Sequence, residues 1–298
     1  MKYFVASGED RQLDAFTRKR LRGSFIDLGD GTTHYELAGS GTKDIVVMIG
    51  GLTIPLFYWD GLASRLQERG FGTLAYSCYG RGYSDRVRDS YGESLFVRQL
   101  SELTQRLGIE RFHLIGTSMG ALIAMAYAAQ HAGTLVTLTL AGPAGLGAKP
   151  ALPPWLTRRD WLMTFVARRF GQRLLKRHLS HNVQDPQLAT EAAQMILDAY
   201  RYRGAMYALF STMRNFPLSG RAELFRHTQS LNVPTLLVWG ENDLVTPISQ
   251  LEIARDLLKP QQCDVIKGCG HMAPFERPRE VASLIAGFTA AHTIGLDS

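Results

Sequence analysis

Residues 112–130 read FHLIGTSMGALIAMAYAAQ, and this stretch decides the fold prediction. A short apolar run leads into Gly116-Thr117-Ser118-Met119-Gly120, and an alanine-rich stretch typical of a helix follows. A sharp turn between a strand and a helix brings backbones close together, so small residues are needed two positions before and after its apex. The pattern predicts a strand–turn–helix that exposes the Ser118 hydroxyl and points the helix N-terminus at an anion developing there.

The rest of the chain alternates short apolar runs with helical patterns. Strands are predicted at residues 24–28, 33–38, 45–49, 72–76, 112–115, 135–140, 235–239 and 262–266. Helices are predicted at residues 59–69, 93–107, 119–130, 248–258 and 278–290. Gly29-Asp30-Gly31 indicates a hairpin turn between the first two strands. The alternation indicates crossover connections and therefore an α/β fold with a mostly parallel eight-stranded sheet covered on both faces.

One long segment interrupts this alternation. Residues 144–230 begin after Pro143, contain further prolines, and continue as helical patterns rich in arginine and aromatic residues. We therefore predict a discontinuous core, residues 1–143 and 231–298, with a helical cap inserted at 144–230.

The net charge of +6 is concentrated in that insertion. Residues 145–230 carry 13 Lys and Arg against 5 Asp and Glu, whereas the rest of the chain carries 20 against 22. No helix-turn-helix, zinc-finger or RNP-like motif accompanies the basic residues, so no nucleic-acid partner is expected. Solvated helix faces are the first interpretation, and an anionic substrate, a lipid surface or a protein partner are the alternatives.

Composition restricts the remaining classes. The 298 residues are 45% hydrophobic and 20% charged, as in a soluble globular chain that buries a large core. The longest apolar stretch, residues 121–129, is too short to span a bilayer, and residues 1–14 lack a secretory apolar segment. Three cysteines, Cys78, Cys263 and Cys269, do not suggest a disulfide framework. A cytoplasmic location is therefore predicted, and the oligomeric state stays open.

A serine hydroxyl is a weak nucleophile unless a base takes its proton. Two histidines follow the second half of the predicted sheet, His271 and His292. His271 lies in a glycine-bearing loop directly after the strand at 262–266, whereas His292 lies near the end of the last helix. His271 is therefore the candidate base.

The base in turn needs a carboxylate that orients it. The strand at 235–239 ends in Gly240-Glu-Asn-Asp243, which offers Glu241 and Asp243. Asp243 precedes Leu-Val-Thr-Pro, a turn that would hold it still, so it is the stronger candidate. The loop after the strand at 135–140 contains no carboxylate.

At these residues the chain resembles the α/β-hydrolase family. The elbow at 116–120, the acid loop ending in Asp243 and the His271 loop follow the family's order of Ser, Asp and His. The segment from Gly80 to Ser84 is also similar to the family's Gly-x-Gly-x-Ser turn. The resemblance covers residues 24–288, with 142–230 corresponding only to the family's variable helical cap.

The resemblance implies an oxyanion hole made of two backbone N–H groups, those of Met119 and Leu52. Most relatives have His-Gly where this chain has Gly50-Gly51, which affects the conformation of the loop more than its chemistry. Serine at the elbow disfavours haloalkane dehalogenases and epoxide hydrolases, which have aspartate there. No cofactor or metal site is expected, because the sequence has no metal-ligand spacing, P-loop or dinucleotide fingerprint.

The leading hypothesis is a serine esterase, similar to carboxylesterases and monoacylglycerol lipases, with the triad Ser118, His271 and Asp243. Its substrate would be a small ester with an apolar acyl or aryl group. The alternatives are hydrolysis of lactones, thioesters or C–C bonds, with Arg158, Arg159, Arg168 or Arg169 binding a substrate carboxylate. A catalytically silent ligand receptor is the third alternative.

Overall fold

The centre of the molecule is one eight-stranded sheet. The computed structural model describes residues 1–39, 44–147, 155, 159–179 and 182–293. The strands are β1 (Ser24–Asp27), β2 (Thr32–Ala38), β3 (Ile45–Ile49), β4 (Gly72–Tyr76), β5 (Phe112–Thr117), β6 (Leu135–Ala141), β7 (Thr235–Gly240) and β8 (Gln262–Ile266). Their order is β1-β2-β4-β3-β5-β6-β7-β8. Each lies within two residues of its predicted position.

The sheet is parallel from β4 to β8, and only β1 and β2 run antiparallel to their neighbours. The β1–β2 pair closes the predicted hairpin, and the amide of Leu28 donates to the carbonyl of Gly31 at 3.0 Å. The predicted α/β fold with a mostly parallel eight-stranded sheet is thereby confirmed. In such a sheet the carboxyl ends of the parallel strands meet at one edge, where ligands bind.

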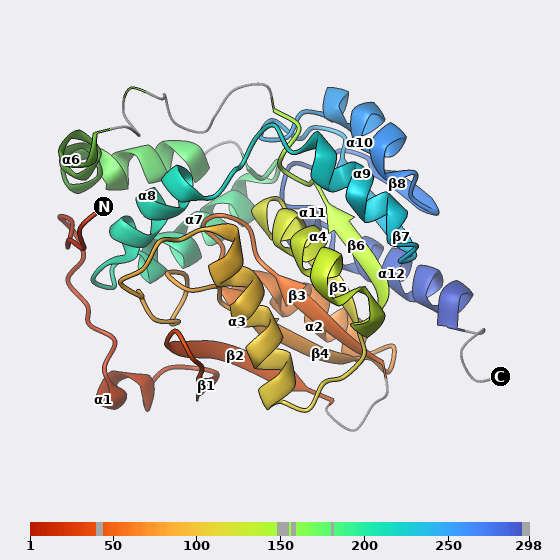
Figure 1. Cartoon of the computed structure of the whole chain (residues 1–298), viewed down its shortest axis with the longest axis horizontal. Coiled ribbons are helices and arrows are strands. Elements are labelled where there is room, and N and C mark those ends of the chain that lie inside the picture. Colours follow the sequence, from red (N-terminus) through yellow and green to blue (C-terminus); the bar gives the residue numbers. More distant parts are fainter. Residues whose placement is uncertain (40–43, 148–154, 156–158, 180–181, 294–298) are drawn as a thin grey trace.

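Helices cover both faces of the sheet (Figure 1). One face carries α3 (Glu93–Arg106), α4 (Met119–His131), α9 (Ala222–Ser230) and α10 (Leu251–Leu258), and the other carries α2 (Asp60–Gln67) and α12 (Pro278–Thr293). The shorter elements are α1 (Ala15–Arg18), η1 (Leu56–Trp59), η2 (Ala132–Thr134), η3 (Ile248–Gln250) and α11 (Ala273–Glu276). No helix in the described part of the chain is long and apolar enough to cross a membrane.

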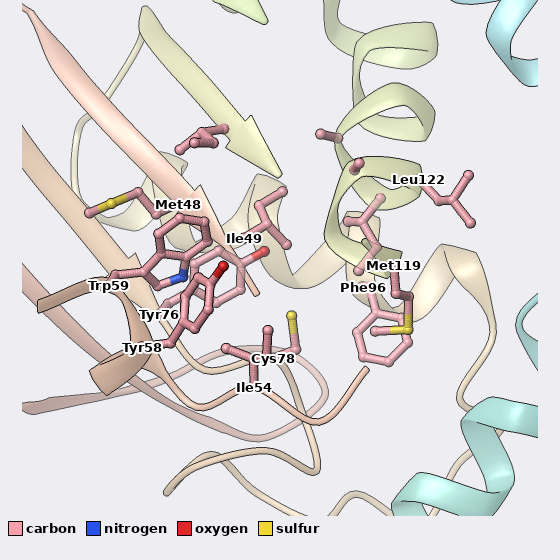
Figure 2. Packing of buried hydrophobic residues seen from close by; sticks show 14 of the residues in the cluster. Met48, Ile49, Ile54, Tyr58, Trp59, Tyr76, Cys78, Phe96, Met119 and Leu122 are labelled. Atoms are coloured by element: carbon pink, nitrogen blue, oxygen red, sulfur yellow. The ribbon is translucent and has the colours of Figure 1, made fainter. Parts of the chain in front are cut away.

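The core is densest around α4, where residues 119–128 are all buried. A helix that is apolar on nearly every side must be covered on every side. The sheet covers one side of α4, and α3 and α9 cover the others. Figure 2 shows Met119 and Leu122 extending from α4, and Met48 and Ile49 extending from β3 within the same core. Every residue of β3 and β5 is buried, and burial on both faces explains the continuous apolar sequence of β3.

Between β6 and β7 the described chain forms α6 (Asp160–Leu179), α7 (Pro186–Ala199), α8 (Ala205–Asn215) and α9. Figure 1 shows α6 and α8 side by side, apart from the helices that cover the sheet. The helix α9 packs against α4 and α10, so the end of the segment 144–230 lies over the sheet. The proposed division into a core and a cap stays a prediction.

The N-terminal segment, which the sequence analysis assigns to the core, is bonded to α7 and α8. The backbones of Arg11 and Tyr202 form an isolated parallel β-bridge. Next to it, Nη2 of Arg201 lies 2.5 Å from Oδ2 of Asp10 in an ion pair. The carboxylate of Glu9 accepts the amides of Gly204 at 3.0 Å and Met206 at 2.6 Å, at the N-terminus of α8. A carboxylate stabilises the orphan N–H groups and the positive dipole end of a helix. Burial raises the pKa of Glu9, while these amide donors act in the opposite direction.

We expect Glu9→Gln to lower the free energy of unfolding by about 1–3 kcal/mol, because one carboxamide oxygen cannot accept all the amides that two carboxylate oxygens accept. Chemical denaturation followed by circular dichroism measures this loss. Glu191→Gln, at an exposed position of α7, is the matched control and should leave the midpoint unchanged. Equal midpoints for Glu9→Gln and the control would show that Glu9 does not stabilise the α8 junction.

Candidate functional site

Ser118 lies at the apex of the turn between β5 and α4. Its backbone has φ 56° and ψ −118°, a left-handed conformation that costs a non-glycine residue about 1–3 kcal/mol. The Ser118 amide donates to Ala141 at the end of β6, and the Ser118 carbonyl accepts from Ala121 and Ala144. These bonds hold the strained turn in place at the carboxyl edge of the sheet.

The elbow requires its glycines because backbones meet there. A Cβ on Gly116 would lie 2.3 Å from the carbonyl oxygen of Gly120, and one on Gly120 would lie 2.3 Å from that of Ile49. A Cβ on Gly51 would lie 3.2 Å from the Cβ of Ser118. The glycines thus bring the loop after β3 directly against the serine.

Asp243 and His271 form a buried hydrogen-bonded pair. Nδ1 of His271 lies 2.7 Å from Oδ2 of Asp243, and their residues are 5% and 3% exposed. This bond places a proton on Nδ1 and leaves Nε2 as the second ring nitrogen, able to act as an acceptor. Ser118 and His271 line the same pocket, although no hydrogen bond joins them among the described residues.

The Asp243 carboxylate is held by a turn that the sequence analysis identified only in outline. Its Oδ1 accepts the amides of Val245 and Thr246, both at 2.8 Å, and its Oδ2 lies 2.7 Å from the Thr246 hydroxyl. Thr246 also lies 3.3 Å from Nδ1 of His271, a contact that the sequence did not indicate. A Cβ on Gly142 would lie 3.2 Å from Oδ2 of Asp243, so the loop after β6 closes over the pair.

The loops after β7 and β8 are joined by their backbones. The amide of Asn242 donates to Cys269 at 2.9 Å, and a Cβ on Gly240 would lie 2.0 Å from the carbonyl oxygen of Gly270. The buried carboxylate of Glu276 accepts the amides of Gly270 and Gln184, each at 2.9 Å. Glu276, which the sequence analysis did not select, therefore ties the His271 loop to the segment between α6 and α7.

Glu241 and His292, the weaker candidates for the acid and the base, are not part of the buried hydrogen-bonded pair. Glu241 accepts the amide of Gly268 at 2.9 Å and is exposed, with no bond to His271 among the described residues. His292 lies in α12, where its Nδ1 bonds the carbonyl of Phe288 in the same helix. The structure thus brings Asp243, and not Glu241, to the histidine of the β8 loop.

The loop after β3 is held from behind by a buried arginine. Arg81, in the turn after β4, is fully buried and donates through Nε to the carbonyl of Leu52 at 2.8 Å. The same guanidinium donates to Tyr79 and to the Thr212 hydroxyl of α8 at 2.9 Å. Met119 is the first residue of α4, where amides have no partner within the helix. Leu52 and Met119 both line the pocket beside Ser118.

The pocket has a volume of about 480 Å³ and is largely apolar. Its walls include Leu174 and Leu175 of α6, Phe210 and Met213 of α8, and Leu218. Of the aromatic residues in the described part of the segment 144–230, Phe210 lines the pocket, whereas Tyr200 and Phe225 are buried away from it and Trp161 and Phe165 are exposed.

Two amide side chains also line this pocket, those of Asn182 and Gln250. The side-chain oxygen of each is buried and accepts no hydrogen bond from the described residues. An acceptor in this state favours a ligand that brings a donor.

Within the described residues there is no group of three or more His, Cys, Asp or Glu that could hold a metal ion. All three cysteines are free thiols, and burial raises the pKa of Cys78 to about 11 and of Cys269 to about 12. A thiol reacts as its thiolate, so these two are poor nucleophiles at neutral pH.

The fold and this site define a hydrolase of the α/β class, with serine at the elbow between β5 and α4. The family model described as "alpha/beta hydrolase fold" matches residues 44–278, and the chain belongs to this family.

Curated and solved relatives show how varied the family is around this chain. Monoacylglycerol lipase ABHD6 of Mus musculus is 28% identical over 280 residues, covering 84% of this chain and 77% of its own. A 2-hydroxy-6-oxononadienedioate/2-hydroxy-6-oxononatrienedioate hydrolase of Klebsiella pneumoniae is 27% identical over 291 residues, covering 94% and 98%. A thermophilic esterase of Thermogutta terrifontis superposes with a TM-score of 0.76 at 22% identity, covering 91% and 100%.

Burial predicts how the thiols react. We expect a disulfide reagent such as DTNB to modify only the half-buried Cys263 in the native protein at pH 8, and all three thiols after denaturation. Burial raises the pKa of Cys263 less strongly than those of Cys78 and Cys269, and the reagent can reach its side chain. The thiolate released from DTNB gives the number of thiols modified before and after denaturation. Rapid native modification of Cys269 would contradict the burial of the loop beside His271.

Proposed function

We propose that this chain is a serine hydrolase that cleaves carboxylic esters with Ser118 as nucleophile, His271 as base and Asp243 as the orienting acid. The observation that carries the proposal is the Asp243–His271 bond of 2.7 Å beside a serine held at φ 56° in one apolar pocket. Such an arrangement activates a hydroxyl without a metal or a cofactor.

In the proposed reaction, the Ser118 oxygen attacks the ester carbonyl while Nε2 of His271 takes the hydroxyl proton. The carbonyl oxygen becomes an anion that accepts the amides of Leu52 and Met119. The C–O bond then breaks, and the alcohol leaves with the proton from His271. A water molecule next attacks the acyl-enzyme with His271 again as base, which releases the carboxylic acid and restores Ser118. Asp243 stays ionised and stabilises the imidazolium in both halves.

An ester fits the pocket better than a dianionic C–C substrate such as the dioate in the name of the Klebsiella relative. The described lining of the pocket includes no lysine or arginine, and a buried carboxylate without a cation is costly. Arg168 and Arg169 line a different, outer groove, and Arg159 lines neither cavity. Arg158 lies outside the described residues.

The polar lining supports an ester whose alcohol carries further hydroxyls. The buried amide oxygens of Asn182 and Gln250 can accept hydrogen bonds, and hydroxyl groups can donate them. The apolar lining, with Leu175, Phe210 and Met213, suits an aliphatic acyl chain. A monoacylglycerol combines both parts, in agreement with the mouse relative, and is the substrate class that we propose.

A substrate panel tests this assignment. We expect monoacylglycerols and p-nitrophenyl esters to be hydrolysed, and a dienone dicarboxylate to be cleaved at least 100-fold more slowly in kcat/KM. Ser118→Ala is the control and should lose at least 10³-fold in ester turnover while keeping its circular dichroism spectrum, because the serine lies at the edge of the pocket. A fluorophosphonate probe should label the wild type and not this variant.

Three results of the panel would each contradict a different part of the proposal. Dienone cleavage faster than ester hydrolysis would replace esterase by C–C hydrolase. An unlabelled wild type without turnover would indicate a silent ligand receptor. Ester turnover retained by purified Ser118→Ala would remove the nucleophile from the proposal altogether.

The identity of the acid is tested separately. We expect Asp243→Asn to reduce kcat by about 10⁴-fold, because an amide cannot hold the imidazole in the required tautomer or stabilise its charged form. Glu241→Gln, two residues away in the same loop and bonded to the amide of Gly268, is the matched control and should keep kcat within about twofold. A larger loss for Glu241→Gln than for Asp243→Asn would reverse the assignment of the acid.

A further inference from the structure

The helix α6 has one buried row and one exposed row of side chains. The buried row follows an i, i+4 spacing through Met163, Ala167, Gly171, Leu175 and Leu179. The exposed row has the same spacing and begins with two large aromatic residues, Trp161 and Phe165, which are 68% and 57% exposed. It continues with Arg169 and Arg173, which are exposed as well. A patch of exposed aromatic side chains beside arginines is typical of an interaction surface.

The charged residues of α6 are almost all cationic. It contains Arg168, Arg169, Arg173, Lys176 and Arg177, whereas its one acidic residue is Asp160. Asp160 is already paired with Arg214 and lies 3.5 Å from the amino terminus. In the described part of the chain, Arg168, Arg169 and Lys176 form no ion pair. The exposed face therefore presents cations together with aromatic rings.

Part of this face, together with Lys2, forms a surface groove of about 660 Å³. Trp161, Thr164 and Phe165 line it with the cationic side chains of Lys2, Arg168 and Arg169. Asp160 lines it as well, with its carboxylate paired to Arg214. The groove combines apolar walls with positive charge, which matches lipid headgroups above acyl chains.

The same helix forms part of the wall of the catalytic pocket. Gly171, Leu174 and Leu175 of α6 line that pocket, and Leu174 is 43% exposed. Leu174 therefore lies at the edge where the pocket meets solvent, about two and a half turns along the helix from Phe165 and about three and a half from Trp161. Figure 1 shows α6 on the outside of the molecule, away from the sheet.

We propose that the exposed face of α6 binds the surface of an anionic lipid membrane and that lipid esters reach Ser118 past Leu174. This inference rests on the proposed function. An amphipathic helix with aromatic residues and unpaired arginines lies in the membrane interface, where anionic headgroups attract its cations. A second copy of this chain fits less well, because a two-fold pairing would bring identical cationic faces together.

Vesicle sedimentation tests the surface directly. We expect the full chain to bind phosphatidylcholine vesicles containing 30% phosphatidylglycerol, with at least tenfold weaker partitioning onto phosphatidylcholine alone. Binding should weaken steeply between 0.05 and 0.5 M NaCl, because salt screens exposed charges over roughly 8 Å at physiological ionic strength. Trp161→Ala/Phe165→Ala and Arg168→Glu/Arg169→Glu should each bind at least tenfold more weakly.

The matched control is Arg106→Glu/Arg111→Glu, which makes the same change in net charge at two exposed positions near the start of β5. It should bind like the wild type. All variants should keep the wild-type melting temperature and kcat/KM for a soluble short-chain ester, since none of these residues lines the catalytic pocket. Turnover of a long-chain monoacylglycerol embedded in anionic vesicles should fall in the α6 variants alone.

Vesicle binding and soluble-ester turnover separate the two proposals. A wild type that cleaves the soluble ester but does not sediment with anionic vesicles overturns the α6 proposal and leaves the esterase intact. If the control variant loses as much vesicle binding as the α6 variants, binding depends on net charge alone. The proposal that α6 is the binding surface would then be wrong. A dimer that Trp161→Ala/Phe165→Ala dissociates, without vesicle binding, would assign this face to a second copy.

Discussion

The contact between the start of α4 and the end of β3 is the constraint on which the site depends. A single Cβ on Gly120 would collide with the carbonyl oxygens of Ile49 at 2.3 Å and Gly50 at 2.7 Å. Because that space is empty, α4 can begin directly above the carboxyl edge of the sheet and press the serine against the loop after β3. Ser118 has φ 56° in this turn, and its backbone bonds to Ala141, Ala121 and Ala144 hold it there.

The second half of the site is built on the same edge by different means. The loops after β7 and β8 meet through backbone hydrogen bonds, and the Asp243 carboxylate accepts from two amides as well as facing the Thr246 hydroxyl and His271. These donors fix the orientation of the buried carboxylate. Glu276 extends the arrangement to Gln184, because one carboxylate accepts the amides of Gly270 and Gln184.

The helices between β6 and β7 connect the site to the outside of the molecule. Arg81 joins the Leu52 loop to Thr212 of α8, and Glu9 joins the N-terminal segment to the start of the same helix. The helix α6 then faces two ways, with small and aliphatic residues toward the pocket and aromatic and cationic residues toward solvent. The lysine and arginine side chains of α6 are thereby on the outside of the molecule, and none of them lines the pocket.

Apolar periodicity and glycine spacing, which are local properties of the chain, predicted the sheet, the elbow and the candidate residues Ser118, Asp243 and His271. The folded structure shows which groups meet across the fold: Thr246 with His271, Arg81 with Leu52, Glu276 with Gln184 and Glu9 with α8. It also decided that Arg168 and Arg169 face an outer groove, contrary to their use for a substrate carboxylate in the alternative hypothesis. Helical periodicity shows which residues share a face of α6. The direction of that face depends on long-range packing, which no local pattern encodes.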